Sequence, residues 1–318
     1  MLSRTALVAW LLAAVFTCFA SDKVASLEVR LLSTMLTADE GYGEWGFAAL
    51  VVADGHRILF DTGAHPDTVL RNARELHIDL SNVPDVILSH HHLDHTAGLV
   101  TLRREYAQSN PTALARAHVG AGIFRSRTDG GAREVNTMVA TKRDYESAGG
   151  TFIEYSQTRE LYPGVWLTGP VPRKYPEKNW NAGRMLRLSD GKTTEDNLPE
   201  DQSLVIVTDK GLVVISGCGH AGIVNTLDYA RAKIASAPIY AALGGFHLYQ
   251  ASDATLAWTA SKLKEFGLQN LLGAHCTGIE AVYRLRQLTG LDRKTAAVGA
   301  VGGGFNLATG LDPGSIAR

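Results

Sequence analysis

A cluster of imidazoles directly after a short apolar run is the feature that most constrains the fold of this chain. Residues 85–89 read Asp-Val-Ile-Leu-Ser after a turn signal and predict a buried strand. The chain then places four ligand-type side chains at His-x-His-x-Asp-His spacing: His90, His92, Asp94 and His95. A strand that ends and releases such side chains into a loop predicts a metal site at the edge of a sheet. The alternative is a histidine-rich surface loop that binds metals adventitiously, and the carboxylate at this spacing argues against it.

The spacing divides these four side chains into two pairs. His90 and His92 lie two residues apart, so they point the same way in an extended segment. Asp94 and His95 lie where the chain turns into a helix, which the apolar spacing predicts over residues 96–108, and they can face a second ion.

The composition is that of a globular protein without a strong charge. Of the 318 residues, 45% are hydrophobic and 20% are charged, which is typical of soluble domains. The formal net charge of -1 gives no overall basic field, so we expect a small-molecule substrate and no nucleic-acid partner. The oligomeric state is left open by the sequence.

The first 20 residues predict a secretory signal peptide. Arg4 supplies the positive charge, residues 6–16 are apolar, and small residues surround a cleavage site after Ala20. The apolar run is shorter than the roughly 20 residues that a transmembrane helix needs. A retained membrane anchor is one alternative and a lipoprotein linked through Cys18 is a weaker one. We therefore expect a secreted or periplasmic protein that begins near Ser21 and has no stable membrane insertion after cleavage.

Two strand-rich halves, each containing a hairpin and followed by helices, are predicted over residues 21–318. The expected strands are 27–31, 47–53, 58–60, 85–89, 113–119, 203–207, 212–215, 239–243 and 270–273, and the expected helices are 68–76, 96–108, 223–235, 255–266 and 279–288. Because two sheets with helices on their outer faces satisfy this order and no linker separates the halves, we expect a single domain.

An irregular insertion is predicted at about 120–199. The segment is polar and holds only short strand candidates, at 151–153 and 165–167. A long, weakly regular stretch inside a compact domain is usually a binding loop or a lid. Tyr175, Trp180 and Arg184 are aromatic and cationic side chains that can close over a substrate. A solvated surface excursion is the alternative.

Further ligand-type residues follow other predicted strands. Asp61, His220, His247 and His275 each come directly after a strand, where a rigid sheet can hold a site. His220 would complete a three-histidine site with His90 and His92, with water as the fourth ligand, which suits catalytic zinc. His275 would join Asp94 and His95 at a second ion, and Asp61 would orient a ligand histidine. His247 is expected to contact substrate or to pack in the core.

The remaining histidines and the two cysteines of the mature chain have simpler readings. His118 is expected to be structural, whereas His56, His65 and His77 are expected at the surface. Cys218 and Cys276 each lie beside a histidine, which favours unpaired cysteines near the metal over a disulfide scaffold. A disulfide between them is the alternative in an oxidising compartment.

With these residues assembled, the chain resembles the metallo-β-lactamase superfamily. Asp61, the loop from His90 to His95 and the late His275 match that superfamily's motifs in order. The resemblance implies an α+β, four-layer αββα sandwich, in which two mixed sheets carry flanking helices and a dinuclear metal site lies at one edge. It also implies two divalent ions, zinc first, with iron or manganese as alternatives.

A narrower resemblance points to one subgroup, named for a dihydropterin ribofuranosylaminobenzene phosphate synthase. Its motifs stand here at residues 59–63, 217–223, 244–248 and 275–278. Many superfamily members place a bridging aspartate after the equivalent strand, where Gly217-Cys218 stands here. They also carry an upstream histidine that is missing in this chain, so His220 is expected to supply that ligand and Cys218 to lie close to the ions.

These observations predict an exported metal-dependent hydrolase. A metal-bound hydroxide would attack an ester, lactone, phosphoester or amide, and Asp94 would be catalytic, positioning the hydroxide and accepting its proton. One alternative is a transferase that acts on a pterin-like or phosphorylated aromatic substrate, as the subgroup name implies, although a signal peptide fits an intracellular pterin pathway poorly. The other is a metal-loaded binding protein without turnover.

Overall fold

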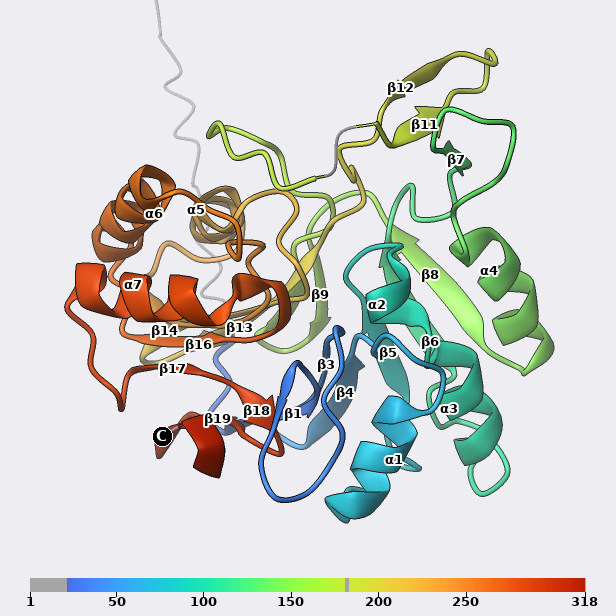
Figure 1. Cartoon of the computed structure of the whole chain (residues 1–318). Helices are drawn as coiled ribbons and strands as arrows, with labels where there is room; N and C mark the ends of the chain where they lie inside the picture. Colours follow the sequence, from blue (N-terminus) through green and yellow to red (C-terminus); the bar gives the residue numbers. More distant parts are fainter. Residues whose placement is uncertain (1–21, 181–182, 318) are drawn as a thin grey trace, which may run out of the picture.

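Two large sheets face each other and helices cover their outer sides (Figure 1). The computed structural model describes residues 22–180 and 183–317, so the predicted signal peptide at 1–20 lies outside the described residues. Within the described ranges, no helix combines the length and the apolar character needed to cross a bilayer.

The first sheet has eight strands in the order β20-β19-β1-β3-β4-β5-β6-β8. Their bounds are β1 (Leu27–Ser33), β3 (Ala48–Ala53), β4 (His56–Phe60), β5 (Asp85–Leu88), β6 (Arg116–Gly120), β8 (Thr151–Tyr155), β19 (Gly304–Asn306) and β20 (Gly310–Asp312). The β3–β4 hairpin turns at Asp54 and Gly55, both at positive φ, as expected for a tight two-residue turn. From β4 to β8 the strands run parallel.

The second sheet has seven strands in the order β17-β16-β15-β14-β13-β10-β9. Their bounds are β9 (Arg159–Tyr162), β10 (Val165–Leu167), β13 (Ser203–Thr208), β14 (Gly211–Ser216), β15 (Ile239–Gly244), β16 (Asn270–Gly273) and β17 (Ala296–Val298). Strands β14 to β17 are parallel. Two small sheets pair β7 (Arg127–Thr128) with β11 (Met185–Arg187) and β12 (Thr193–Glu195), and β2 (Leu36–Thr37) with β18 (Ala300–Val301).

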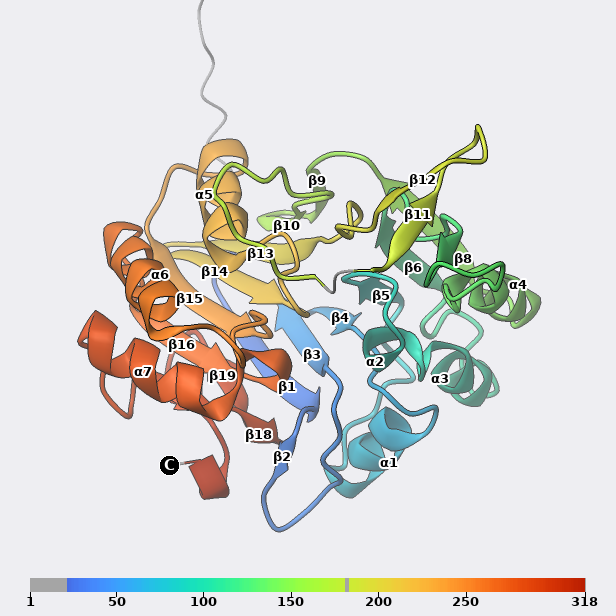
Figure 2. The same ribbon diagram turned by 45° about the horizontal axis from the view of Figure 1, so that its top comes forward.

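Successive side chains along a strand point to opposite faces of its sheet and so enter different apolar cores. In β13, Leu204 and Ile206 join the apolar core between the two sheets, whereas Val205 and Val207 join the core beneath the helices of the second sheet. The helices there are α5 (Ile223–Lys233), α6 (Asp253–Glu265) and α7 (Ile279–Thr289), while α1 (Thr68–Glu75), α3 (Leu99–Tyr106) and α4 (Met138–Ser147) pack on the first sheet (Figure 2). The predicted four-layer αββα fold is therefore confirmed.

The segment predicted as an irregular insertion at about 120–199 contains more regular structure than expected. The two short strands predicted inside it, at 151–153 and 165–167, lie in β8 and β10, whereas helix α4 and strand β9 have no counterpart in the prediction. Helix α4 and strand β8 belong to the first half of the sandwich, and β9 and β10 extend the second sheet. Their sequence signal is weak because α4 buries only Met138 and Tyr145, and β8 is an edge strand with no fully buried residue. The small sheet of β7, β11 and β12 projects beyond the main sheets, as Figure 1 shows.

The helix predicted over 96–108 is divided in the structure. A short helix α2 (Leu93–Thr96) precedes α3, and Gly98 lies between them. A Cβ at Gly98 would lie 2.4 Å from the carbonyl oxygen of Thr62, so only glycine allows this close approach to the chain that follows β4. The break places Asp94 and His95 on a separate turn of helix directly above the end of β5.

Candidate metal centre

The predicted site residues come from the carboxyl ends of parallel strands in both sheets. The loop after β5 and helix α2 supply the side chains from His90 to His95, and the turn after β14 supplies Cys218 and His220. His247 follows β15, and the short 3-10 helix η1 (His275–Thr277) follows β16. Because the ends of parallel strands meet at one edge of a sheet, residues more than 180 positions apart converge there.

His90, His92 and His220 form one group of possible ligands. Their nearest ligand atoms all lie within 4.8 Å of one another. Within residues 22–180 and 183–317, Nε2 of His90 and of His220 has no hydrogen-bond partner, although both atoms are buried. Burial, reinforced by the neighbouring imidazoles, holds the pKa of all three histidines well below the usual range. They are therefore neutral and carry the free lone pairs that a metal requires.

The second nitrogen of two of these rings is held by a neighbour. Nδ1 of His90 lies 2.9 Å from Oγ of Ser89, and that hydroxyl donates to Oδ2 of Asp61 at 2.8 Å. Nδ1 of His220 contacts the backbone carbonyl of Asn179. Such contacts fix the tautomer and direct Nε2 of each ring toward a metal.

Asp94, His95, Cys218 and His275 form a second group, again with ligand atoms within 4.8 Å of one another. Oδ2 of Asp94 lies 3.3 Å from Nε2 of His275 and 3.7 Å from Nε2 of His95. Burial opposes ionisation of Asp94, but the charge on His95 and the His275 contact outweigh it and hold the pKa of this carboxyl below its usual range. A half-buried carboxylate therefore faces two imidazoles.

Asp61 supports the second group from behind. Its Oδ2 lies 2.7 Å from Nδ1 of His95, and its Oδ1 accepts a hydrogen bond from the Ser89 amide at 2.7 Å. Burial disfavours a charged imidazole, but Asp61 and Asp94 together raise the pKa of His95 to about 9. Asp61 holds the His95 ring in place, as expected from the sequence, and its own backbone lies at φ 58°.

Cys218 lies between the two groups. Its sulfur belongs to the set with Asp94, His95 and His275, and also to a third set with His220 and His247. It lies 3.1 Å from Nε2 of His95. Cys276 places its sulfur 3.2 Å from that of Cys218 and accepts a hydrogen bond from the His247 amide, and both cysteines are free. The expectation of unpaired cysteines beside the site agrees with this geometry, and the disulfide alternative does not.

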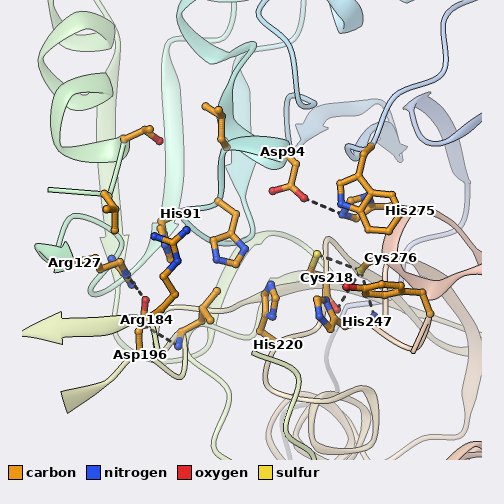
Figure 3. A pocket seen from close by; sticks show the side chains of 17 residues that line it. His91, Asp94, Arg127, Arg184, Asp196, Cys218, His220, His247, His275 and Cys276 are labelled. Atoms are coloured by element: carbon orange, nitrogen blue, oxygen red, sulfur yellow. Dashed lines mark hydrogen bonds and ion pairs between the residues drawn. The ribbon is translucent and has the colours of Figure 1, made fainter. Parts of the chain in front are cut away.

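The two groups open into one pocket of about 400 Å³, and its two sides differ in character (Figure 3). Arg127, Arg184 and Asp196 lie on one side, whereas His275, Cys276 and His247 lie on the other. Trp45 packs its ring edge against His275 with the ring centres 5.1 Å apart, and both line the pocket.

The side of the pocket that carries Arg127, Arg184 and Asp196 was not predicted from the sequence. Nδ1 of His91 lies 2.7 Å from Glu200, and Arg127 donates to Glu200 and to Asp196 at 2.7 Å each. These contacts join residues 69 to 109 positions apart, so no local spacing signals them. Of the three predicted closing residues, Arg184 lines this pocket, whereas Trp180 lies in a neighbouring groove and Tyr175 packs near Trp258.

The other histidines lie away from the site. His118 is buried between Asp85 and Tyr155, as expected for a structural residue. His65 and His77 are exposed, and His56 stacks on Tyr162 at the surface end of β4.

Comparisons with known proteins agree with these motifs. The family model for the metallo-beta-lactamase superfamily matches residues 46–126. The 7,8-dihydropterin-6-methyl-4-(beta-D-ribofuranosyl)-aminobenzene-5'-phosphate synthase of Methanocaldococcus jannaschii is 32% identical over 229 residues, which cover 71% of this chain and 76% of that protein. An uncharacterized protein of the same organism is 30% identical over 265 residues, or 82% of this chain and 94% of that protein.

Solved structures give the same result for the fold. Tm1679, described as a metal-dependent hydrolase of the beta-lactamase superfamily, superposes with a TM-score of 0.69 at 26% identity, covering 88% of this chain and 98% of that chain. The metallo-beta-lactamase fold protein YhfI from Bacillus subtilis has a TM-score of 0.52 at 13% identity over the same shares of both chains. By fold and by sequence, this chain belongs to the metallo-beta-lactamase superfamily.

Proposed function

We propose that this protein is a hydrolase that uses two metal ions to cleave an ester, lactone, phosphoester or amide in a small molecule. The observation that carries the proposal is the pair of adjacent ligand groups at one pocket, with buried imidazole nitrogens that have no hydrogen-bond partner within the described ranges. Burying such atoms without a partner costs about 1–3 kcal/mol each, so a bound ligand is needed to compensate.

The donor atoms fit two divalent ions. Three neutral histidines with an open position are typical of catalytic zinc, and His90, His92 and His220 would hold that ion. Asp94, His95, His275 and Cys218 would hold the second ion, which would replace the protons that raised pKa values keep on His95 and Cys218. A sulfur donor favours zinc over manganese. When bound, the pair supplies a nucleophile at neutral pH and positive charge for the oxygens that become negative.

The protein's own groups position the reactants and take up the proton. The side chain of Asp94 is 25% exposed and lines the pocket, so one carboxylate oxygen can face an attacking water. Its lowered pKa keeps it ionised, and it can accept the proton of that water. Asp61 keeps His95 in orientation throughout, because its carboxylate bonds to the ring and to Ser89 at the same time.

A location outside the cytoplasm is part of the proposal. Its support is the composition of residues 1–20, which carry a positive start, an apolar centre and small residues before Ser21. Mass spectrometry of the N-terminus of the exported protein tests it, since cleavage should leave a chain that starts near Ser21 and continues as one domain to residue 318.

A transferase is the second candidate, favoured by the synthase relative that is 32% identical. In that case the same ions would activate a pterin-like or phosphorylated aromatic substrate and the acceptor would replace water. A metal-loaded binding protein is less well supported. Asp94 is an ionised carboxylate that lines the pocket, and a binding role does not require such a group there.

The test is a metal assay joined to a substrate panel. We expect about two metal ions per chain, and hydrolysis of generic esters, lactones or phosphodiesters that a chelator abolishes and added zinc restores. Less than one ion per chain, or activity that a chelator does not affect, would contradict the proposal. Formation of a condensed product from a pterin-like substrate and a phosphorylated aromatic one, without hydrolysis of the panel, would favour the transferase instead.

A further inference from the structure

Two cysteine sulfurs meet inside the metal pocket, and the proposed function uses only one of them (Figure 3). Cys218 belongs to the second ligand group, whereas Cys276 belongs to none of the three groups of possible ligands among the described residues. Their sulfurs lie 3.2 Å apart, both residues are buried, and both cysteines are free. The structure therefore shows a reduced pair of thiols in which Cys276 has no part in the proposed chemistry.

The contact between the sulfurs is not a consequence of strand pairing. Cys218 follows β14 and Cys276 follows β16, and β15 lies between these two strands in the sheet. Neighbouring strands lie about 4.7–4.9 Å apart, so the two strands that precede the cysteines are roughly 10 Å apart. The segments after β14 and β16 therefore bend toward each other over the end of β15, which brings the sulfurs together.

A glycine at the end of β15 makes room for this approach. A Cβ at Gly245 would lie 1.9 Å from the carbonyl oxygen of Gly217 and 3.0 Å from the sulfur of Cys276, so any other residue would push the two segments apart. The sulfur of Cys276 also accepts a hydrogen bond from the His247 amide at 3.3 Å, and the carbonyl of Cys276 accepts one from the Leu248 amide at 3.0 Å. The chain that follows β15 thus holds Cys276 against Cys218.

The sulfur of Cys218 is also the one that would bind the second ion. It lies 3.1 Å from Nε2 of His95 and shares a ligand group with Asp94, His95 and His275. Both cysteines line the metal pocket, so a small oxidant that enters the pocket can reach them. A thiolate binds zinc, whereas a sulfur in a disulfide is no longer a thiolate. Oxidation of the pair and binding of the second ion therefore compete for Cys218.

We propose that Cys218 and Cys276 form a site of reversible oxidation, at which a peroxide joins them in a disulfide and displaces the second ion. One thiol reacts first: the O–O bond breaks, the sulfur takes one oxygen as a sulfenic acid, and the other oxygen leaves as water. The second sulfur then attacks the sulfenic sulfur and the S–S bond forms. The sulfenic oxygen leaves as a second water, with the protons of its own hydroxyl and of the second thiol. The two sulfurs together lose two electrons, and the peroxide gains them.

The inference rests on the proposed function, since the ion that is displaced is the second of the proposed pair. An S–S bond is about 2.0 Å long, so the two sulfurs have to approach by roughly 1.2 Å from their separation in the structure. The proposed location outside the cytoplasm is a setting in which disulfides form and persist.

Treatment of the full chain with hydrogen peroxide, with and without zinc, tests the proposal. In the zinc-free protein we expect a cross-link between Cys218 and Cys276 in the peptide map and a mass lower by two hydrogen atoms. With free zinc at about ten times the dissociation constant of the second ion, Cys218 is unliganded roughly a tenth of the time, so cross-linking should slow about tenfold. The cross-linked protein should take up one ion where the reduced protein takes up two, and dithiothreitol should restore the second.

Cys276→Ser is the matched control, because it keeps Cys218 for the second ion and removes the partner sulfur. It should take up two ions, and peroxide should add oxygen to Cys218 without a cross-link within the chain. Thermal melts verify that it folds, and Cys276→Ala replaces it if the serine is not tolerated.

The outcomes separate this inference from the proposed function. Consumption of both thiols by peroxide without a cross-link between Cys218 and Cys276 would overturn the inference, and so would a cross-linked protein that still binds two ions. Fewer than one ion on the reduced protein would overturn the proposed function instead. The cross-link would then still support the oxidation site, because its formation is measured in the absence of metal.

Discussion

A buried polar cluster that contains a histidine lies at each end of strand β5. The two clusters differ in whether both ring nitrogens of the histidine have hydrogen-bond partners. At the start of β5, His118 from the neighbouring strand places Nε2 2.8 Å from Asp85 and Nδ1 3.0 Å from the Tyr155 hydroxyl. At its end, Nδ1 of His90 contacts Ser89, but Nε2 has no hydrogen-bond partner in the described ranges. The first cluster is closed, and the second lacks a ligand.

This difference separates the structural residue His118 from the candidate ligand His90 more sharply than burial does. His118 and His90 are both buried, and both lie beside a carboxylate network. Asp85 is saturated because Arg116 donates to both of its oxygens at 2.6 and 2.8 Å, and the Tyr162 hydroxyl donates as well. Because the great majority of polar atoms inside proteins are paired, a buried ring with one fixed and one vacant nitrogen, as in His90 and His220, indicates a binding role.

The largest effect is expected from replacing one histidine of each cluster by alanine and comparing the two variants. His90→Ala should remove metal and lower kcat/KM by about 1,000-fold or more, since metal ions supply several kcal/mol of transition-state stabilisation. His118→Ala should keep the metal and lose only stability. Metal content by mass spectrometry and kinetics on a substrate from the panel measure both, with exposed His77→Ala as the control. Metal loss in His118→Ala alone would break the distinction.

A second prediction concerns the closed cluster. Asp85→Asn should lower the free energy of unfolding by about 3 kcal/mol, because His118 and Arg116 lose the charge that they share. The value is at the low end of the range for buried ion pairs, since the side chain of Arg116 is half exposed. Urea unfolding measures it, and Asp67→Asn at an exposed site is the control. Metal content should stay unchanged, so its loss would show that the two clusters are not independent.

A third and smaller effect is expected at the carboxylate that orients His95. Asp61→Asn should weaken metal binding about 10- to 100-fold, as is common when the partner of a ligand histidine is changed. Competition with a chromophoric chelator measures the affinity of each ion. The ion of the second group should be affected more, because Asp61 contacts His95 of that group directly and the first group only through Ser89. Equal affinities in variant and parent protein would contradict a positioning role.

The cluster at the end of β5, which we call open because Nε2 of His90 has no partner among the described residues, could be predicted largely from sequence. Its signals are local. The His90 to His95 spacing, the apolar run before it and the Asp54-Gly55 hairpin each depend on residues near one another, and the continuous apolar run at 203–207 predicts β13. The αββα layers follow from the order of such elements. Four candidate ligands lie within six residues, so only Cys218, His220 and His275 had to be found at a distance.

What could not be predicted depends on contacts between distant segments. Nothing near Glu200 signals that it lies 2.7 Å from His91, and Glu177 meets the start of α5 across 47 residues. The closed cluster is of the same kind, since Asp85 and Tyr162 are 77 positions apart. Helix α4 was missed because two buried residues in ten give too little periodicity. Long-range polar pairs carry no spacing rule, so they become visible only once the sheets are in place.

The smallest effect expected is a pH dependence of stability at the closed cluster. Burial disfavours the charge on Asp85, but hydrogen bonds from His118 and Arg116 outweigh it and hold the pKa of the native carboxyl below its usual range. The stabilisation is therefore complete above the unfolded pKa near 4 and is lost progressively as the pH falls below it. The difference in unfolding free energy between parent and Asp85→Asn should shrink by about 1 kcal/mol between pH 4 and pH 3. Urea unfolding of both proteins at each pH measures this, and metal loss at low pH affects both alike. If this difference in unfolding free energy stays constant or grows on acidification, Asp85 is protonated in the native protein. The closed cluster would then lack the ionised carboxylate on which its contrast with the open cluster depends.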